Sequence, residues 1–310
     1  MNKLKQMHFA LFLAIVTSLC FMFPAILIKL IMDEISTTGA LAIRFFIAAA
    51  TFFIVLYVYS GKKSVKEIIR TDAKELKEYM LLGFILAASL TTLFASFTYI
   101  NANKAMLIFM MYPLFDGVLA WIFLKEKITH ADCGAVLATL IGSGFIFGID
   151  ILKFEHVTGD LLVIIGTFLF AAYLVLSRSI GKHHEYNKRT AWLFIFAFFF
   201  LMIAFYFTES PVILFELKGM TWLWLILLGT ACTVVPYMCL SYATAYIKSS
   251  VVGIILLLGN ILSIGLVSII FNETMTTNMY VGAGFILGAF LISTICEWQD
   301  ENKRYHHAHH

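Results

Sequence analysis

The sequence predicts an all-α integral membrane protein with ten transmembrane helices. Of its 310 residues 61% are hydrophobic and only 13% are charged, and the apolar residues gather in runs of about 20 separated by short polar breaks. One soluble core cannot hide 30 Phe, 13 Tyr and 5 Trp, so a soluble fold is excluded. The runs are also too long and too uniformly apolar for the strands of a membrane barrel.

The predicted spans account for about two thirds of the chain. They are 9–31, 39–59, 80–100, 105–124, 131–149, 160–178, 191–207, 221–243, 250–271 and 279–297. The first span begins like a signal peptide, but it is longer than the apolar core of such a peptide and has no small-residue cleavage site. It is therefore expected to remain as a helix of the mature protein.

The positive charges set the predicted orientation. Most of the 22 Lys and Arg fall in alternate breaks, and the exceptions are Lys29, Lys104, Lys153, Lys218 and Arg44, the last of which lies within a span. Cytoplasmic loops of membrane proteins are enriched in Lys and Arg. Both termini are therefore predicted to be cytoplasmic (N-in/C-in), in a multi-pass protein of the cell inner (plasma) membrane.

An internal repeat is visible in the sequence. Residues 99–129 and 246–276 align without a gap at an offset of 147 residues, with Tyr, Ile, Glu and Thr recurring in register. Glycine-rich strings at 142–148 and 282–288 follow in each half. The predicted units are therefore residues 1–149 and 150–298, which hold five helices each.

The odd number of crossings in each unit inverts the second unit relative to the first. The result is a 5+5 inverted-topology repeat, which is associated with alternating-access carriers. Two further segments are expected on the cytoplasmic side: an amphipathic inner-face segment over 61–79 and a polar tail over 299–310. The histidines of the tail would bind a metal only weakly, and a disordered tail is the favoured interpretation.

With this organisation, the chain resembles the drug/metabolite transporter superfamily, in particular its EamA-type ten-helix members. The resemblance extends over nearly the whole chain, in the order and spacing of short motifs. These are Lys29 near the end of the first span, Ile43-Arg44-Phe45-Phe46, Pro113, Gly159-Asp160, Glu126 and Glu273 at equivalent span ends, and the two glycine-rich spans.

The chain departs from the family pattern at three places. Ser18-Leu19-Cys20-Phe21 stands where Trp-Gly is common, Gly259-Asn260 stands where a second proline is common, and Lys125 and Asn272 replace the glycine before each glutamate. These departures weaken any transfer of substrate identity from the family.

The resemblance implies a central cavity between spans 1–4 and 6–9, and two polar stripes agree with it. Because hydroxyls find no partner in lipid, both stripes are expected to face inward. For any one hydroxyl, hydrogen bonding between helices is an equal alternative to substrate binding. The stripes are Ser89, Thr92, Ser96 and Tyr99 in the third span, and Thr230, Thr233, Tyr237, Ser241 and Thr244 in the eighth.

Asp116 is the acid predicted to bind substrate. It lies near the centre of a span, where an ionised carboxylate costs about 2.5–3.5 kcal/mol. Tyr112 and Phe109 share its helix face, and the repeat aligns it with Ser263 and aligns Pro113 with Asn260. The hypothesis is that Asp116 binds a cationic group of the substrate or takes up a proton; a structural acid paired with Lys or Arg is the alternative.

Four charged residues at span ends are predicted to gate or couple transport. Arg44 and Lys29 lie toward the external ends of their spans, where interface anchoring is the alternative. Glu126 and Glu273 occupy equivalent helix ends on opposite faces of the membrane, as the inversion requires. They are interpreted as matched gate or hinge contacts.

Together these features predict a secondary active transporter, not an enzyme, for a small polar or amphipathic metabolite: an amino acid, an aromatic compound or an organic cation. Coupling to protons or to exchange is left open, and a channel, a lipid scramblase or, less favoured, a membrane enzyme are the alternatives. No cofactor, metal or nucleic acid is expected. The expected partners are the metabolite, membrane lipids and a second protomer, packed through 131–149 and 279–297.

Overall fold

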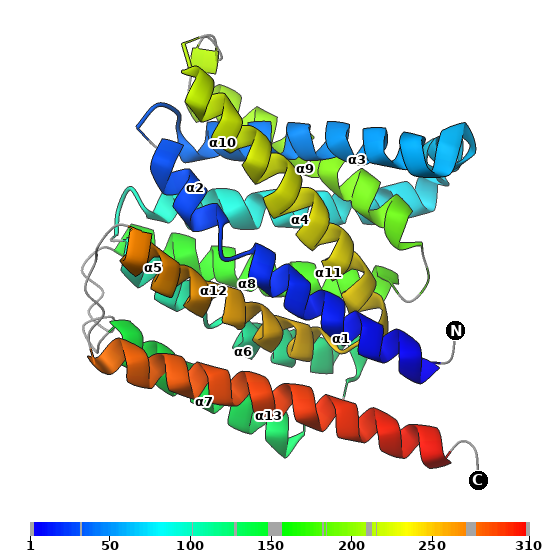
Figure 1. The fold of residues 1–310 in the computed structure, drawn as a ribbon, viewed down its shortest axis with the longest axis vertical. Coiled ribbons are helices and arrows are strands. Elements are labelled where there is room, and N and C mark those ends of the chain that lie inside the picture. Colours follow the sequence, from blue (N-terminus) through cyan, green and yellow to red (C-terminus); the bar gives the residue numbers. More distant parts are fainter. Residues whose placement is uncertain are drawn as a thin grey trace.

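The computed structural model describes residues 3–31, 33–100, 102–126, 129–147, 157–181, 183, 185–208, 213–214, 216–270 and 277–307, and among them it contains helices and no strands (Figure 1). The elements are α1 (Lys3–Cys20), α2 (Pro24–Ile31), α3 (Thr37–Ile69), α4 (Ala73–Ser96), α5 (Ala102–Phe109), α6 (Tyr112–Leu119), the π-helix η1 (Ala120–Leu124), α7 (His130–Phe147), α8 (Val157–Gly181), α9 (Tyr186–Thr208), α10 (Gly219–Gly229), the π-helix η4 (Thr230–Val234), α11 (Val235–Tyr246), α12 (Ser249–Ile270) and α13 (Thr277–His307).

Every predicted span overlaps helix, which confirms an all-α protein. Five stretches are long and apolar enough to cross a membrane, namely Thr37–Tyr59, Ala73–Ser96, Val157–Gly181, Tyr186–Thr208 and Gly219–Tyr246. Shorter apolar helices cover the other predicted ranges. The start of α1 and the end of α13 lie on the same side of the bundle (Figure 1). The count of ten crossings and the N-in/C-in orientation stay predictions.

Prolines interrupt three of the predicted spans. The first span breaks between α1 and α2 just before Pro24, the fourth breaks between α5 and α6 just before Pro113, and the eighth passes through η4 just before Pro236. Proline has no N–H and cannot donate to the carbonyl four residues earlier. The carbonyl four residues before each proline therefore needs another partner; at the first break the N–H of Phe23 donates to the carbonyl of Cys20 at 3.4 Å.

The predicted inner-face segment over 61–79 is two helical pieces, not one amphipathic helix. The chain bends at Gly61, whose φ of 75° favours glycine, and a break at 70–72 separates α3 from α4. The indole Nε1 of Trp192 in α9 donates to the carbonyl of Ile68 at 3.2 Å and to the hydroxyl of Thr71 at 2.9 Å. This segment is therefore fixed against α9. At the other end of the chain, α13 continues as helix through residues 299–307 of the predicted polar tail.

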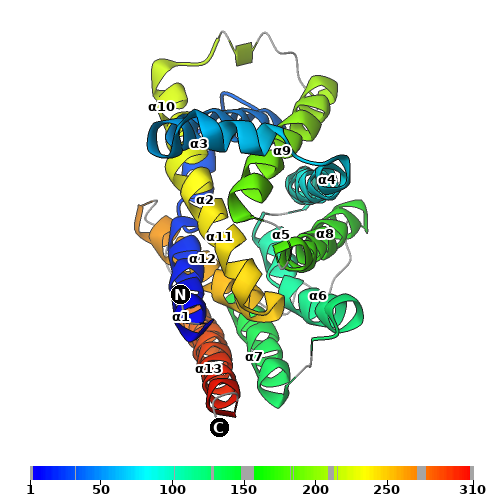
Figure 2. The same cartoon turned by 90° about the vertical axis from the view of Figure 1, so that its right-hand side faces the viewer.

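The helices of the two predicted halves interleave in layers (Figures 1 and 2). α3 and α10 lie toward one end of the long axis, and α7 and α13 pair at the other. Between them α1 packs on α11 and α12, while α8 packs on α4 and α6. Exchanging the corresponding helices of the two halves converts the first set of contacts into the second. An internal repeat predicts this pattern of contacts.

The tightest of these contacts joins α1 to α12. The hydroxyl of Ser18 donates to the carbonyl of Ile255 at 2.8 Å and accepts the N–H of Gly259 at 2.7 Å. In an α-helix these two backbone groups would pair with each other. The hydroxyl therefore enters the backbone ladder of α12, as happens at helix kinks. Gly259 is required here because a Cβ would collide with the backbone of Ser18.

A glycine substitution tests this contact. Gly259→Ala is expected to lower the free energy of unfolding by about 1–3 kcal/mol, because the added methyl group overpacks the α1–α12 contact. Gly284→Ala is the matched control: a Cβ at Gly284, also within a helix, meets no described atom within 4 Å. Thermal unfolding of both purified variants measures the difference. Equal melting temperatures would show that the close approach of α1 and α12 is not tight in solution.

Candidate functional site

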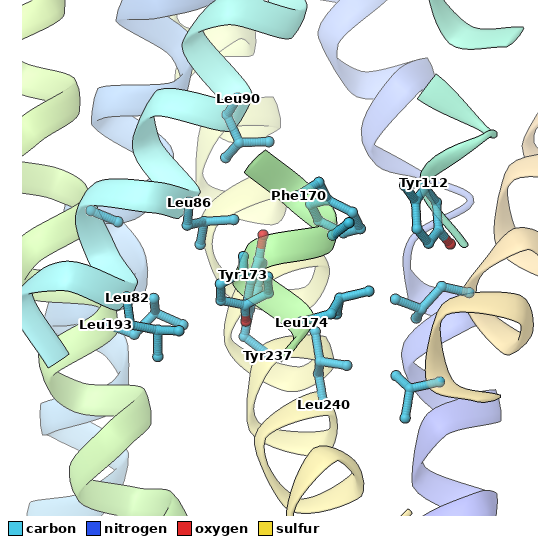
Figure 3. Packing of buried hydrophobic residues seen from close by; sticks show 14 of the residues in the cluster. Leu82, Leu86, Leu90, Tyr112, Phe170, Tyr173, Leu174, Leu193, Tyr237 and Leu240 are labelled. Atoms are coloured by element: carbon cyan, nitrogen blue, oxygen red, sulfur yellow. The ribbon is translucent and has the colours of Figure 1, made fainter. Parts of the chain in front are cut away.

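The centre of the bundle is lined by a row of aromatic rings from several helices. Tyr112 contacts Phe109 at 5.5 Å and Phe170 at 5.0 Å between ring centroids, Phe170 contacts Tyr173 at 5.9 Å, and Tyr173 contacts Tyr237 at 6.4 Å. Figure 3 shows four of these rings among buried leucines of α4, α8, α9 and α11. The row therefore connects α5 and α6 of the first half to α8 and α11 of the second.

Asp116 lies beside this row, where α6 packs on α12. Its side chain is fully buried, and neither carboxylate oxygen makes a hydrogen bond within the described part of the chain. The buried hydroxyl of Ser249 in α12 faces it, and the hydroxyl of Tyr112 donates to the carbonyl of Gly253 at 2.6 Å. A Cβ at Gly253 would lie 3.1 Å from Oδ2 of Asp116 and 3.3 Å from the ring of Tyr112.

Asn260 and Ser263, which the repeat aligns with Pro113 and Asp116, do not share this site. At 1.5 Å per residue they lie about 10 and 15 Å further along α12 from Gly253. Asn260 is half-buried and Ser263 is buried. A sequence repeat pairs equivalent positions, and in antiparallel helices these fall at opposite ends of the contact. Substrate binding by these two residues stays a prediction.

The hydroxyls of the predicted stripe in α4 bond to helix backbone. Ser89 donates to the carbonyl of Gly166 in α8 at 2.8 Å, Thr92 donates to Ala88 of its own helix at 2.8 Å, and Ser96 donates to Leu93 at 2.6 Å. Tyr99, at the end of the stripe, is 51% exposed. The packing alternative therefore describes the first three, and substrate contact by all four stays a prediction.

Arg44 of α3 is buried against η4. Its Nε donates to the hydroxyl of Thr233 at 2.6 Å, and its Nη2 donates to the carbonyl of Cys232 at 3.0 Å. Cys232 lies four residues before Pro236, so its carbonyl is the one that the proline leaves free. Arg44 therefore bonds to the interrupted backbone of η4 in the other half. Gating or coupling by Arg44, and the alternative of interface anchoring, stay predictions.

Two arginines contact the ends of α8 and α11, at the predicted cytoplasmic side of the bundle. Arg178 pairs with Glu126 across the halves at 3.2 Å and donates to the carbonyl of Thr244 at 3.2 Å. The fully buried Arg189 of α9 donates to the carbonyls of Ser177 in α8 and Ser241 in α11. Carbonyls near helix C-termini carry negative partial charge, which stabilises a buried guanidinium.

A second charged cluster lies in the loop before α3, at the predicted external side. The Nζ of Lys218 donates to Oε1 of Glu34 at 2.8 Å, and the hydroxyl of Thr221 donates to Oε2 at 2.7 Å. These hydrogen bonds, that of Lys218 first, lower the pKa of Glu34 from its ordinary value of 4.5 to about 2. The cluster ties the link between the first two spans to the start of α10.

Two of the predicted gating residues, Lys29 and Glu273, have no described side chain. Glu273 lies outside the described residues, and of Lys29 only the backbone, within α2, is described.

Among the described side chains no group of three or more His, Cys, Asp or Glu comes together to hold a metal.

Sequence reasoning missed several residues of this region. Phe170 and Tyr173 lie in an apolar run, where an aromatic side chain resembles any lipid-facing one; their spacing of three, which puts both on one helix face, was the available signal. Arg178 and Arg189 were interpreted only as cytoplasmic charges. Nothing in the sequence indicated that Ser18 inserts into α12, except that Gly259-Asn260 replaces the second proline that is common in the family.

Comparison with known proteins gives consistent results. The chain matches the model of the EamA-like transporter family over residues 8–148 and 157–295. It is 27% identical over 201 residues to the uncharacterized transporter YyaM of Bacillus subtilis (strain 168), an alignment that covers 63% of this chain and 64% of that protein, less than two thirds of its length. It is 23% identical over 273 residues to an uncharacterized transporter of Archaeoglobus fulgidus, covering 88% and 81% of the two chains.

A further relative and a solved structure are also similar to this chain. Solute carrier family 35 member G1 of Mus musculus is 28% identical over 167 residues, which cover 48% of this chain and 43% of that protein. A solved crystal structure of a protein with 16% sequence identity superimposes with a TM-score of 0.78 over 94% of this chain and 98% of that chain, which shows a shared fold. The names of the relatives indicate transporters rather than enzymes.

The Glu34 cluster predicts a pH dependence of stability. Because the folded-state pKa of Glu34 lies below its ordinary value, the ionised carboxylate stabilises the folded chain above about pH 4.5, and this contribution is lost as the pH falls toward 2. Glu34→Gln is therefore expected to lower the melting temperature at pH 7 and to have a shrinking effect between pH 4.5 and pH 2. Thermal unfolding across this range measures it, with the exposed neighbour Asp33→Asn as control. A constant difference would contradict the assignment.

Arg189 is expected to be essential for the packing of α8, α9 and α11. Arg189→Lys keeps the charge but cannot reach two carbonyls on different helices at once. An unsatisfied buried acceptor costs about 1–3 kcal/mol, so a melting temperature several degrees lower is expected. The adjacent, half-buried Lys188→Arg serves as the control. A wild-type melting temperature for Arg189→Lys would refute the role of the planar guanidinium.

Proposed function

Because the chain belongs to the EamA-like transporter family, within the drug/metabolite transporter superfamily, we propose that it is a secondary active transporter that moves a small polar or amphipathic metabolite across the inner membrane by alternating access. Membership of the family and the names of the relatives support a membrane transporter generally. The mechanism rests on one observation, which is an asymmetry between two equivalent hydroxyl contacts.

The two contacts occupy matching positions in the halves. Ser18 bonds to the carbonyl of Ile255, and Thr167 lies near the carbonyl of Ile108. Ile108 and Ile255 are 147 residues apart, the offset of the repeat, while Ser18 and Thr167 are 149 residues apart, the offset between residues 8 and 157, where the two matches to the family model begin. The first contact is tight, at 2.8 Å. In the second the oxygens are 3.5 Å apart, and Thr167 donates instead to Val163 of its own helix at 2.7 Å.

An inverted repeat gives this difference a mechanical meaning. If the two halves exchange conformations when the site opens to the other side, Thr167 inserts at the break between α5 and α6 while Ser18 withdraws from α12. The two states then differ by the exchange of equivalent bonds, so their free energies stay close. We assign Ser18 and Thr167 to this exchange.

The charged clusters fit gates at the two ends of the site. The Arg178–Glu126 pair joins the halves at the predicted cytoplasmic end and closes it. At the predicted external end the Glu34 cluster acts similarly, with Arg44, Lys29 and Glu273 as further gating or coupling groups. Asp116 binds the substrate and takes up a proton when the substrate leaves. The groups that face Asp116 are Tyr112, Ser249 and Glu126.

Accessibility measurements test the exchange without a known substrate. In a variant without the native cysteines, Ala105→Cys and Ser250→Cys report on opposite predicted ends of the site, and a membrane-impermeant maleimide measures their exposure from each side of sealed vesicles. Ser18→Ala and Thr167→Ala are expected to shift labelling in opposite directions, by about tenfold for each 1.4 kcal/mol of bias.

The control removes a hydroxyl that bonds only within its own helix. Thr139→Ala in α7 does this, because Thr139 donates to the carbonyl of Ala135, and it is expected to label like the parent. If Ser18→Ala and Thr167→Ala move labelling in the same direction, or neither moves it, the exchange mechanism is wrong.

A further inference from the structure

We infer that the substrate is an organic cation, an amine or quaternary ammonium compound with an apolar or aromatic body, held between Asp116 and the rings of Tyr112, Phe170 and Tyr173. This inference rests on the proposed carrier function and names the substrate class for the same site. Three features of the described residues carry it: the distribution of charge, the aromatic surfaces and the convergence of acid, ring and apolar side chain at Gly253.

The charge distribution favours a cationic ligand. Asp116 makes no ion pair in the described part of the chain; the hydroxyl of Ser249 faces it, and the other charged group that influences it is a second acid, Glu126. The buried arginines nearby bond to other groups: Arg44 to Cys232 and Thr233, and Arg189 to helix carbonyls. Among the described residues, the buried charge that protein groups leave unmatched is therefore negative.

The aromatic row supplies the second half of an ammonium site. A cation over a ring face is attracted by the negative face of the π-system, by about 0.5–2 kcal/mol per favourable contact when water is excluded. Tyr112, Phe170 and Tyr173 are buried and contact one another in sequence, with Tyr112 one helical turn from Asp116. The hydroxyl of Tyr173 makes no hydrogen bond among the described groups, so it is available to a polar substituent.

At Gly253 the acid, the ring and an apolar side chain converge on one point. A Cβ at this position would lie 3.1 Å from Oδ2 of Asp116, 3.3 Å from Cε2 of Tyr112 and 3.8 Å from Cδ1 of Leu174. These are the three surfaces that an alkylammonium group needs: an anion, a ring and an apolar wall. The two shorter distances leave too little room for a Cβ in this state, so an ammonium group reaches this point only when the contact between α6 and α12 opens during the carrier cycle.

A matched series of probes tests the substrate class. Phenethylamine, phenylalanine and 3-phenylpropanoate share one aromatic body and carry a cation, a zwitterion and an anion at neutral pH. Isothermal titration of the detergent-solubilised full chain is expected to show the highest affinity for phenethylamine and no binding of 3-phenylpropanoate. Failure of phenethylamine to bind, or tighter binding of either carboxylate compound, would overturn the inference.

Variants then locate the site. Asp116→Asn is expected to weaken phenethylamine at least about tenfold, because the amide cannot balance the charge. Phe170→Leu is expected to weaken it about 3- to 10-fold by removing a ring face. Phe200→Leu is the matched control; Phe200 pairs with Phe84 at 5.1 Å, away from the row. Thermal unfolding of each variant checks that it is folded. Unchanged affinity in folded Asp116→Asn would refute the site.

Counterflow separates the two proposals. Proteoliposomes loaded with unlabelled phenethylamine are expected to accumulate the labelled amine transiently, and Asp116→Asn is expected to abolish this. Binding without counterflow would support the cation site and contradict the carrier mechanism. Reciprocal maleimide labelling in the Ser18 and Thr167 variants without amine binding would support the carrier mechanism and refute the cation class.

Discussion

The backbone hydrogen bonds of interrupted helices are the constraint on which the rest of this structure depends. In a bilayer no water is available to satisfy a free carbonyl or N–H, so each break in a helix needs a partner from elsewhere in the protein. At η4 that partner is the guanidinium of Arg44, and in α12 it is the hydroxyl of Ser18, which occupies both backbone groups. The helices are thus joined at the places where they are least regular.

These bonds are also what relates the two halves. Thr17 donates to the carbonyl of Pro236, and at the positions equivalent to these Ser89 donates to the carbonyl of Gly166. Each contact joins the same two equivalent positions. The donor lies on the first helix of a half in one contact and on the third helix of a half in the other. Hydrogen bonds between membrane helices average only about 0.6 kcal/mol, so a few of them can be exchanged without a large free-energy barrier or a strong preference for one state. Packing by large interlocking side chains would not allow this.

The sequence predicted the class of fold and the positions of the helices because apolar run length depends directly on bilayer thickness. It did not predict how the broken helices are satisfied: Pro24, Pro113 and Pro236 lie within predicted spans, but a proline does not reveal which side chain bonds the carbonyl that it frees. The same holds at Lys125, which adopts a left-handed φ of 55° where the family has glycine, a conformation visible only in the structure. In the candidate site, Asp116 was predicted from its cost in the membrane, whereas Phe170 and Tyr173 were not, since aromatic residues in apolar runs carry no such signal.

The asymmetry between acids and bases in this core follows from helix chemistry. A broken or ending helix offers free carbonyls, which are acceptors, and a buried arginine can therefore be satisfied by the fold itself, as Arg44 and Arg189 are. Free N–H donors occur mainly at helix N-termini, and proline at the start of a broken segment removes one of them; the N–H of Gly259 within α12 is already bonded to Ser18. Asp116, five positions into the α6 segment that Pro113 opens, has no such donor bonded to it in the described chain. A fold built from interrupted helices thus neutralises Arg44 and Arg189 with its own backbone, while the carboxylate of Asp116, which no described cation pairs, is left to a proton or a ligand.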